Sequence, residues 1–231
     1  MSGADAYARG RAVFMGVEML VAPGALVPRE ETELLGNTAL QLLQGMGLAA
    51  PTLIDMCCGS GNLGCALAVR IPGAHVWSSD LTDGCVSVTR RNVEHLGLLE
   101  RVSVHQGDLF ASLEGLGLEE RCDVVVCNPP YISAKRLEGD RAHLLEHEPR
   151  EAFDGGPYGI SIHQRVIKLA PAFLKPGGYL LFEIGEGQDR QVTLLFERAK
   201  AYDDIRLVAD AQGKARVALG RKRSTGHIET K

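Results

Sequence analysis

Short apolar runs alternate with longer segments of helical periodicity along most of the chain. Short apolar-rich runs predict strands at 53–57, 76–79, 102–105, 122–126 and 179–184. The run at 122–126 predicts a strand that is buried on both faces. Apolar residues recur at helical spacing between these runs, at 29–44, 62–70, 82–96, 160–174 and 191–202. Segments 205–209 and 216–219 predict a closing hairpin. This alternation predicts an α/β domain with a doubly wound sheet of six or seven strands.

The remaining segments suggest the domain limits. Residues 1–25 are expected to form an N-terminal extension whose first ten residues are frayed, and residues 221–231 a basic, solvated C-terminal tail. The domain itself is expected over 26–220. Segment 132–159 has no clear period, and a loop of that length inside a compact domain is often a functional lid.

Composition and charge narrow the classes of function. The 231 residues are 45% hydrophobic and carry a net charge of −4, so the chain has no general basic field for nucleic acid. It shows neither an apolar stretch of membrane-spanning length nor a secretory leader, and we expect a cytoplasmic protein that does not engage membranes. The six cysteines lack paired C-x-x-C spacing, which favours buried thiols over disulfides or zinc.

The strongest chemical signal follows the apolar run 122–126. Asn128, Pro129, Pro130 and Tyr131 come directly after it, and the two prolines cannot continue a sheet's hydrogen-bond ladder. The chain must therefore leave the sheet at Asn128, at the edge where open α/β sheets bind ligands. A side-chain amide oxygen beside a fixed backbone carbonyl offers two acceptors. Such a pair suits a planar N–H2 group.

A second signal indicates a nucleoside site. Gly59, Gly61 and Gly64 follow the first predicted strand, where glycines let a ligand approach the backbone of a helix amino terminus. Asp80 ends the second strand 19 residues after Gly61 (80 − 61 = 19), the usual distance for a carboxylate that meets a ribose hydroxyl. This glycine pattern alone also fits a nicotinamide or flavin oxidoreductase.

Three further polar residues favour S-adenosyl-L-methionine over a dinucleotide. Asp55 ends the first strand, where a carboxylate would crowd a pyrophosphate but suits an amino-acid ammonium group. Asp108 follows the third strand, and Asn128 follows the fourth. A solvated acidic loop is the plain alternative for Asp108.

One motif suggests a metal. The pentapeptide from His143 to His147 fits the H-x-x-E-H pattern of zinc peptidases. It stands near a proline in the aperiodic segment and has no evident third ligand, so we expect a surface turn and no metal site.

Taken together, the ordered motifs resemble the release-factor glutamine methyltransferases (the PrmC/HemK family). The resembling stretches lie at 23–33, 55–61, 128–131, 148–150, 154–156 and 176–178, with Asp210, Gly213 and Arg216 near the end. The resemblance implies a class I methyltransferase (Rossmann-like) fold with a seven-stranded, mostly parallel sheet and helices on both faces. It also implies S-adenosyl-L-methionine as cofactor and S-adenosyl-L-homocysteine as product.

The resemblance assigns roles to individual residues. It implies cofactor contacts at Asp55, Cys57, Gly59, Gly61, Asp80, Leu81, Asp108, Leu109 and Asn128. It implies a catalytic corner of Asn128, Pro129 and Tyr131. It implies substrate contacts at Arg29, Glu31, Pro130, Tyr131 and Glu148.

The chain departs from the family pattern in three places. Cys57 stands where the family usually has glycine, and Glu30 where it usually has proline. Bacterial members also carry an amino-terminal helical domain that helps to dock the release factor, whereas 25 residues precede Leu26 here.

Several acceptors therefore remain open. A glutamine in a release factor leads, and a small-molecule amide, amidine or amine is the alternative. Nucleobase methylation comes third, because the acidic balance argues against nucleic acid. A cofactor-binding module without catalytic activity is the alternative from another class.

Overall fold

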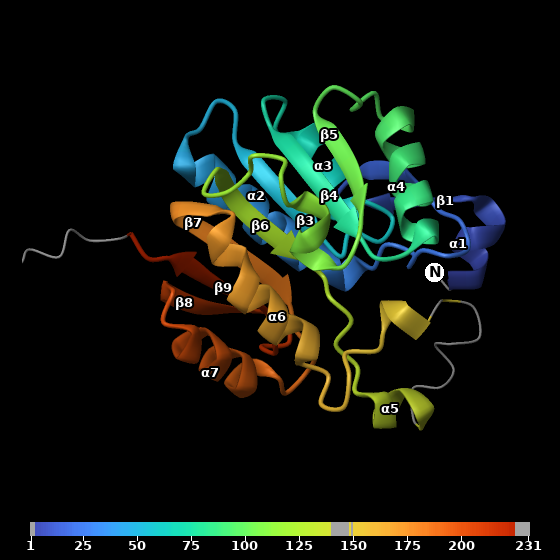
Figure 1. Ribbon diagram of the computed structural model, residues 1–231. Helices are drawn as coiled ribbons and strands as arrows, with labels where there is room; N and C mark the ends of the chain where they lie inside the picture. Colours follow the sequence, from blue (N-terminus) through green and yellow to red (C-terminus); the bar gives the residue numbers. More distant parts are fainter. Residues whose placement is uncertain (1–2, 140–147, 149, 225–231) are drawn as a thin grey trace, which may run out of the picture.

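The computed structural model describes residues 3–139, 148 and 150–224. Seven strands form one sheet in the order β5-β4-β3-β6-β7-β9-β8, shown in Figure 1. Their bounds are β3 (Thr52–Met56), β4 (His75–Asp80), β5 (Val102–Gln106), β6 (Cys122–Cys127), β7 (Leu174–Glu183), β8 (Tyr202–Ala209) and β9 (Ala215–Lys222). The first five pair in parallel, whereas β9 is antiparallel to both β7 and β8.

Helices cover both faces of the sheet. The α-helices are α1 (Gly3–Arg9), α2 (Glu33–Met46), α3 (Asn62–Arg70), α4 (Asp83–His95), α5 (Ala134–Glu138), α6 (Ser161–Leu169) and α7 (Asp189–Ala199). Short 3-10 helices are η1 (Glu30–Thr32), η2 (Leu109–Leu113), η4 (Arg150–Ala152) and η5 (Ala170–Ala172). In Figure 1, α6 and α7 lie on one side of the sheet, and α2 and α3 lie on the other. The predicted doubly wound architecture is confirmed.

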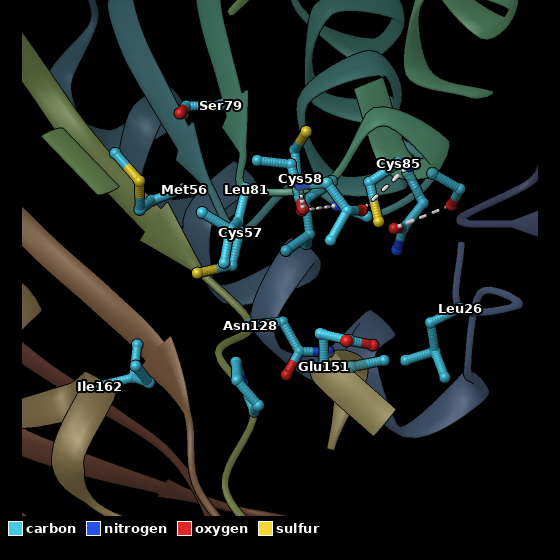
Figure 2. A pocket seen from close by; sticks show the side chains of 18 of the residues that line it. Leu26, Met56, Cys57, Cys58, Ser79, Leu81, Cys85, Asn128, Glu151 and Ile162 are labelled. Atoms are coloured by element: carbon cyan, nitrogen blue, oxygen red, sulfur yellow. Dashed lines mark hydrogen bonds between the residues drawn. The ribbon is translucent and has the colours of Figure 1, made fainter. Parts of the chain in front are cut away.

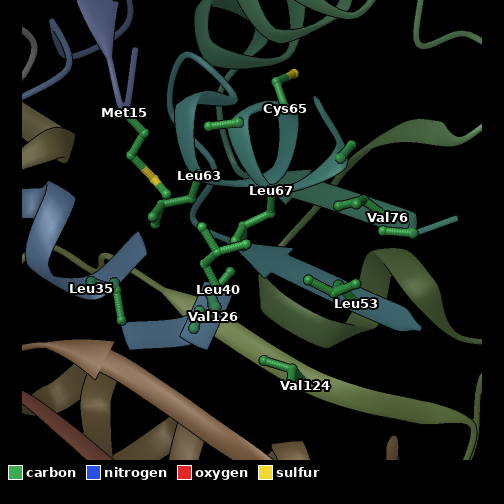
Figure 3. Packing of buried hydrophobic residues seen from close by; sticks show 14 of the residues in the cluster. Met15, Leu35, Leu40, Leu53, Leu63, Cys65, Leu67, Val76, Val124 and Val126 are labelled. Atoms are coloured by element: carbon green, nitrogen blue, oxygen red, sulfur yellow. The ribbon is translucent and has the colours of Figure 1, made fainter. Parts of the chain in front are cut away.

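Two cores lie on opposite faces because successive strand residues point in opposite directions. On β6, Val124 and Val126 face the core beneath α2 and α3, as Figure 3 shows. Val125 and Cys127 face the other core, which is formed with η2, α6 and α7. This double burial explains why all four residues from Val124 to Cys127 are apolar.

The amino-terminal residues are more ordered than the sequence suggested. The expectation of a frayed start is wrong for Gly3–Arg9, which forms α1. A hairpin of β1 (Arg11–Phe14) and β2 (Val17–Leu20) follows, and it joins the core shared with α2 and α3. A side-chain carbon at Gly36 would lie 2.3 Å from Met15 Sδ, so the Met15 side chain occupies the space beside this glycine of α2.

Three predicted boundaries near the end of the chain are also corrected. Helix α7 ends at Ala199, and Tyr202 is a buried residue that opens β8. Strand β7 begins at Leu174 and passes through the Pro-Gly-Gly stretch. Gly178 lies close to the neighbouring strand there, since an added side-chain carbon would stand 2.9 Å from the carbonyl oxygen of Asp123. The basic tail does not start at 221, since β9 runs to Lys222.

The hydrogen bonds of Arg221 and Lys222 also show that these residues are part of the folded domain. Arg221 Nε donates to Asp203 at 2.8 Å, and Lys222 Nζ donates to Glu120 at 2.6 Å and to the carbonyl of Leu174. Both residues therefore belong to strand β9 inside the sheet rather than to a solvated terminus.

Several remaining expectations concern thiols, metals and membranes. All six cysteines are free, and all but the half-buried Cys57 are buried, as predicted. Across the described parts of the chain, no helix has the length and hydrophobicity needed to span a bilayer, and no cluster of potential metal ligands occurs. The H-x-x-E-H pentapeptide lies outside the described residues, and the cytoplasmic location stays a prediction.

Candidate active site

A pocket opens at the carboxyl ends of β3, β4 and β6, where the strand order of the sheet reverses. It holds about 990 Å³ of empty space, counted out to the open solvent. Figure 2 shows Cys57, Cys58 and Leu81 on one side of this space, and Asn128 and Glu151 on the opposite side. The walls comprise residues 26–29, 32, 56–60, 62–63, 79–82, 85, 107–109, 128, 130, 151–152 and 162.

The turn between β3 and α3 shapes one wall through unusual backbone angles. Cys57, Gly59 and Gly61 have φ of 57°, 58° and 77°. The left-handed region favours glycine, which explains why a glycine would suit the position of Cys57. A side-chain carbon on Gly59 would meet nothing within 4 Å, so the backbone stands open to the pocket there. At Gly61 it would lie 2.6 Å from Thr89 Cγ2, so Gly61 serves helix packing and does not line the pocket.

Asp55 lies buried next to this turn, with no exposed surface. Its Oδ2 accepts a hydrogen bond of 2.8 Å from the backbone N–H of Gly64, whereas Oδ1 has no partner among the described residues. Burial raises the pKa of Asp55 to about 7, although the Gly64 hydrogen bond opposes this effect. The free oxygen is an acceptor suited to a cationic group.

Asp80 is fixed at the end of β4 as the second predicted carboxylate. Its Oδ2 accepts from Gly59 N–H at 2.9 Å, and its Oδ1 accepts from Thr82 N–H at 3.2 Å. Each oxygen keeps a second lone pair. The neighbouring Leu81 lines the pocket and is 59% exposed, so an apolar surface lies beside a carboxylate, as a nucleoside requires.

Asp108 and Leu109 form the wall that follows β5. Asp108 Oδ2 accepts from Arg165 of α6 at 2.7 Å, so its charge is partly engaged. Leu109 has a φ of 51° and is buried below the pocket. The predicted third carboxylate therefore does reach the same edge of the sheet.

The corner after β6 places Asn128 at the pocket. Asn128 Nδ2 donates to Thr32 Oγ1 at 3.1 Å, and Asn128 and Pro130 both line the cavity. Pro129 is buried behind them. Tyr131 turns away from the cavity, and its hydroxyl donates to Glu183 Oε1 at 2.9 Å. Burial and the Glu183 charge raise the pKa of Tyr131 well above its usual value.

The predicted substrate residues occupy different places. Arg29 lines the pocket and forms an ion pair with the buried Glu148. Glu148 Oε1 also accepts from the N–H of Val27 at 3.2 Å, so this carboxylate fastens the segment that carries Arg29 rather than facing the cavity. Glu31 is exposed and lies outside the lining.

The structure thus gathers most of the predicted site at one cavity. The predicted residues that line it are Arg29, Cys57, Gly59, Asp80, Leu81, Asp108, Leu109, Asn128 and Pro130. Those outside the lining are Glu31, Asp55, Gly61, Pro129, Tyr131 and Glu148. Sequence reasoning missed Thr32, Glu151 and Ile162. Thr32 lies inside the stretch 23–33 that carries part of the resemblance, but its spacing gives no sign that it meets Asn128.

Comparisons with known proteins agree with this geometry. The family model described as a methyltransferase small domain matches residues 35–156. A release factor glutamine methyltransferase of Geobacter sulfurreducens is 36% identical and aligns with 93% of this chain and 72% of its own length. One of Moorella thermoacetica is also 36% identical, with 94% and 74% covered.

Solved structures confirm the expected class I methyltransferase fold. A release-factor-specific protein-(glutamine-N5) methyltransferase of Alicyclobacillus acidocaldarius superposes with a TM-score of 0.51 at 25% identity, covering 88% of this chain and 99% of its own. A methyltransferase of Pyrococcus furiosus gives 0.62 at 15% identity, with 96% and 94% covered. A 16S rRNA methyltransferase of T. thermophilus, solved with AdoMet and guanosine, gives 0.64 at 21%, with 92% and 50% covered, and shows the shared fold.

Proposed function

This chain belongs to the family of release factor glutamine methyltransferases, and we propose that it methylates the side-chain amide of a glutamine in a peptide chain release factor with S-adenosyl-L-methionine. The observation that supports the proposal is the Asn128 corner, where the side-chain amide of Asn128 lies in the wall of the same cavity as Gly59, Asp80 and Leu81. The family's enzymes are methyltransferases, and this chain is one of them.

The residues around the pocket fit the cofactor. Asp55 offers the unpartnered Oδ1 for the ammonium group, and Gly59 leaves open space at the turn after β3. Asp80 would accept from the ribose hydroxyls, while Leu81 would lie against the adenine ring and Asp108 would face its amino group. When bound, S-adenosyl-L-methionine supplies an electrophilic methyl group on a sulfonium centre and leaves as S-adenosyl-L-homocysteine.

The protein's own task is to position a weak nucleophile. The lone pair of an amide nitrogen is delocalised into its carbonyl group. Asn128 Oδ1 and the Pro129 carbonyl would accept both N–H groups of the glutamine, fix its plane and stabilise the positive charge that develops on nitrogen. The proton can leave after transfer, so the site needs no strong general base. The buried Pro129 and the lining Pro130 keep the corner rigid.

Replacing Asn128 tests this assignment. We expect Asn128→Ala to lower turnover about 100-fold or more, because a misplaced amide loses orientation and charge stabilisation, while cofactor affinity changes little. The assay follows labelled methyl transfer from S-adenosyl-L-methionine to a release factor, with the labelled residue located by mass spectrometry. Asn37→Ala, at an exposed position of α2, is the matched control. An equal loss of turnover and cofactor affinity would contradict the role.

The same assay decides between acceptors. Label in a glutamine side chain supports the release factor as substrate, and label confined to a small-molecule extract supports the alternative amide, amidine or amine acceptor. Label in nucleic acid would favour an exocyclic base amine, which also presents a planar N–H2 group. The net charge of −4 stands against this last acceptor.

A further inference from the structure

A buried polar cluster extends from the wall of the cavity, where Thr32 and Asn128 lie, to the buried Glu183 behind the Asn128 corner. We name it the Glu183 cluster, and it comprises Thr32, Asn128, Tyr131, Glu183 and Arg216. Thr32 is 1% exposed and Glu183 is 2% exposed. A carboxylate at such depth is unfavourable unless its surroundings stabilise the charge, so the cluster needs a physical reason.

The carboxylate of Glu183 is held from several directions. Tyr131 donates its hydroxyl to Oε1 at 2.9 Å, and Arg216 Nη2 lies 3.7 Å from Oε1. The strand carrying Glu183 is fixed as well, since the Nε2 atom of the buried His163 lies 2.9 Å from the Glu183 carbonyl oxygen. Oε2 makes no hydrogen bond at normal distance within the described structure. Burial raises the pKa of Glu183, and the neighbouring Thr32 and Tyr131 hydroxyls and the Arg216 charge oppose that rise.

The hydrogen bond between Asn128 and Thr32 fixes the orientation of the Asn128 amide. An ionised carboxylate can only accept, and a threonine hydroxyl has one hydrogen to donate. In the structure Thr32 Oγ1 accepts from Asn128 Nδ2 at 3.1 Å, which leaves the Thr32 hydrogen available for the neighbouring Glu183 carboxylate. Asn128 Oδ1 is then left to face the cavity.

We propose that Thr32 and Glu183 are positioning residues, which hold the Asn128 amide so that its oxygen rather than its N–H2 group faces the methyl acceptor. The inference rests on the proposed function, because it explains how the pocket would select an acceptor that presents N–H2. With the amide reversed, Asn128 would present donors to a donor group. The Glu183 cluster thus sets the polarity of the corner as well as its shape.

Thr32 offers a nearly isosteric test. Thr32→Val keeps the branched shape but removes the hydroxyl, and we expect turnover to fall about 10- to 100-fold with cofactor affinity unchanged. Thr32→Ser, which restores the hydroxyl, should recover most of that loss. Thr38→Val is the matched control in α2, since the Thr38 hydroxyl donates to the Leu34 carbonyl at 2.7 Å, within its own helix. Glu183→Gln should act in the same direction as Thr32→Val, because a neutral amide can donate to Thr32 and reverse the chain of hydrogen bonds.

A second readout observes Asn128 itself and requires no acceptor. The side-chain N–H2 signals of Asn128 in a proton–nitrogen NMR spectrum are assigned by their loss in Asn128→Ala. Thr32→Val should shift them, and Thr38→Val should leave them in place. The circular dichroism spectrum and melting temperature of each variant confirm that it is folded.

The outcomes separate the two proposals. A wild-type protein that methylates no release factor overturns the proposed function, and the NMR comparison then decides the inference alone. Unchanged Asn128 signals in Thr32→Val overturn the inference. So does a loss of turnover in Thr32→Val no larger than that in Thr38→Val, when the wild type is active.

Discussion

The buried carboxylate of Asp55 makes a quantitative prediction about stability and pH. Its side chain has no exposed surface, so solvent does not screen the charge. Burial raises its pKa from 3.8 to about 7. This rise in pKa means that ionised Asp55 destabilises the folded protein by about 4 kcal/mol relative to the unfolded chain.

The direction of the effect follows from proton linkage. Between pH 4 and pH 7 the unfolded chain has lost the Asp55 proton, while the folded protein keeps it. Stability contributed by Asp55 is therefore fully present at low pH and falls as the pH rises through the folded pKa. The integrated loss between pH 5 and pH 8 is about 2.5 kcal/mol, with little further change above pH 8.

Asp55→Asn isolates this contribution. Asparagine has the same shape and can still accept from the Gly64 N–H, but it does not titrate. Urea unfolding of both proteins at intervals from pH 5 to pH 8 gives the difference in free energy of unfolding. We expect the wild type to lose about 2.5 kcal/mol relative to Asp55→Asn across this range. A difference that stays constant with pH would refute the burial argument.

Cofactor binding should show the opposite trend at the same residue. An ammonium group held by Asp55 favours the ionised carboxylate, so the affinity for S-adenosyl-L-homocysteine should rise by up to about tenfold per pH unit between pH 5 and pH 7. Calorimetric titration of the wild type and Asp55→Asn measures this dependence. A wild-type affinity with the same pH profile as Asp55→Asn would show that Asp55 does not meet the ammonium group.

Two further predictions concern packing. Gly61→Ala should destabilise the protein by about 2 to 4 kcal/mol, because the added carbon would lie 2.6 Å from Thr89 Cγ2 at a residue with a φ of 77°. The control Gly47→Ala, at a φ of 64° with open space around it, should cost about 1 kcal/mol. Equal losses of unfolding free energy for the two variants in chemical denaturation would contradict the steric argument. Phe196→Ala should cost about 3 to 5 kcal/mol, since Phe196 is fully buried between Phe182 and Tyr202. Leu194→Ala, at a 40% exposed position of the same helix, should cost far less by the same assay.

The sequence predicted the sheet edge well because strand ends carry local signals. Asp80, Asp108 and Asn128 each follow an apolar run, and parallel strands bring such ends together without further information. The five predicted parallel strands overlap β3 to β7, and the antiparallel hairpin appears as β8 and β9. The periodicity of the apolar residues and the turn residues at the strand ends were sufficient to predict these strands.

What the sequence could not give depends on tertiary contacts. Helix α1 is short and polar, and its place is fixed by Ala6 and Tyr7, whose hydroxyl donates to the carbonyl of Ala25 at 2.7 Å. Thr32 meets Asn128 across 96 residues, and Glu148 reaches Arg29 across 119 residues. No local pattern encodes pairs so far apart in the chain.

The buried carboxylates of the described chain fall into two kinds, according to whether both of their oxygens have partners. Asp123 is paired with Lys175 and accepts from the N–H of Thr52, and Glu148 is paired with Arg29.

By contrast, Asp55 and Glu183 each keep a buried oxygen without a hydrogen bond at normal distance. The other unpartnered buried atoms in the described structure belong to Ser78, the register partner of Asp55, and to His163, which contacts the Glu183 carbonyl. Unsatisfied acceptors are unfavourable, and a fold that kept them for stability alone would gain by replacing them. These unpartnered atoms lie at two points, one beside the glycine turn and one behind Asn128. This is the arrangement expected if a cofactor ammonium group binds Asp55 and if the Asn128 amide is oriented by the residues around Glu183.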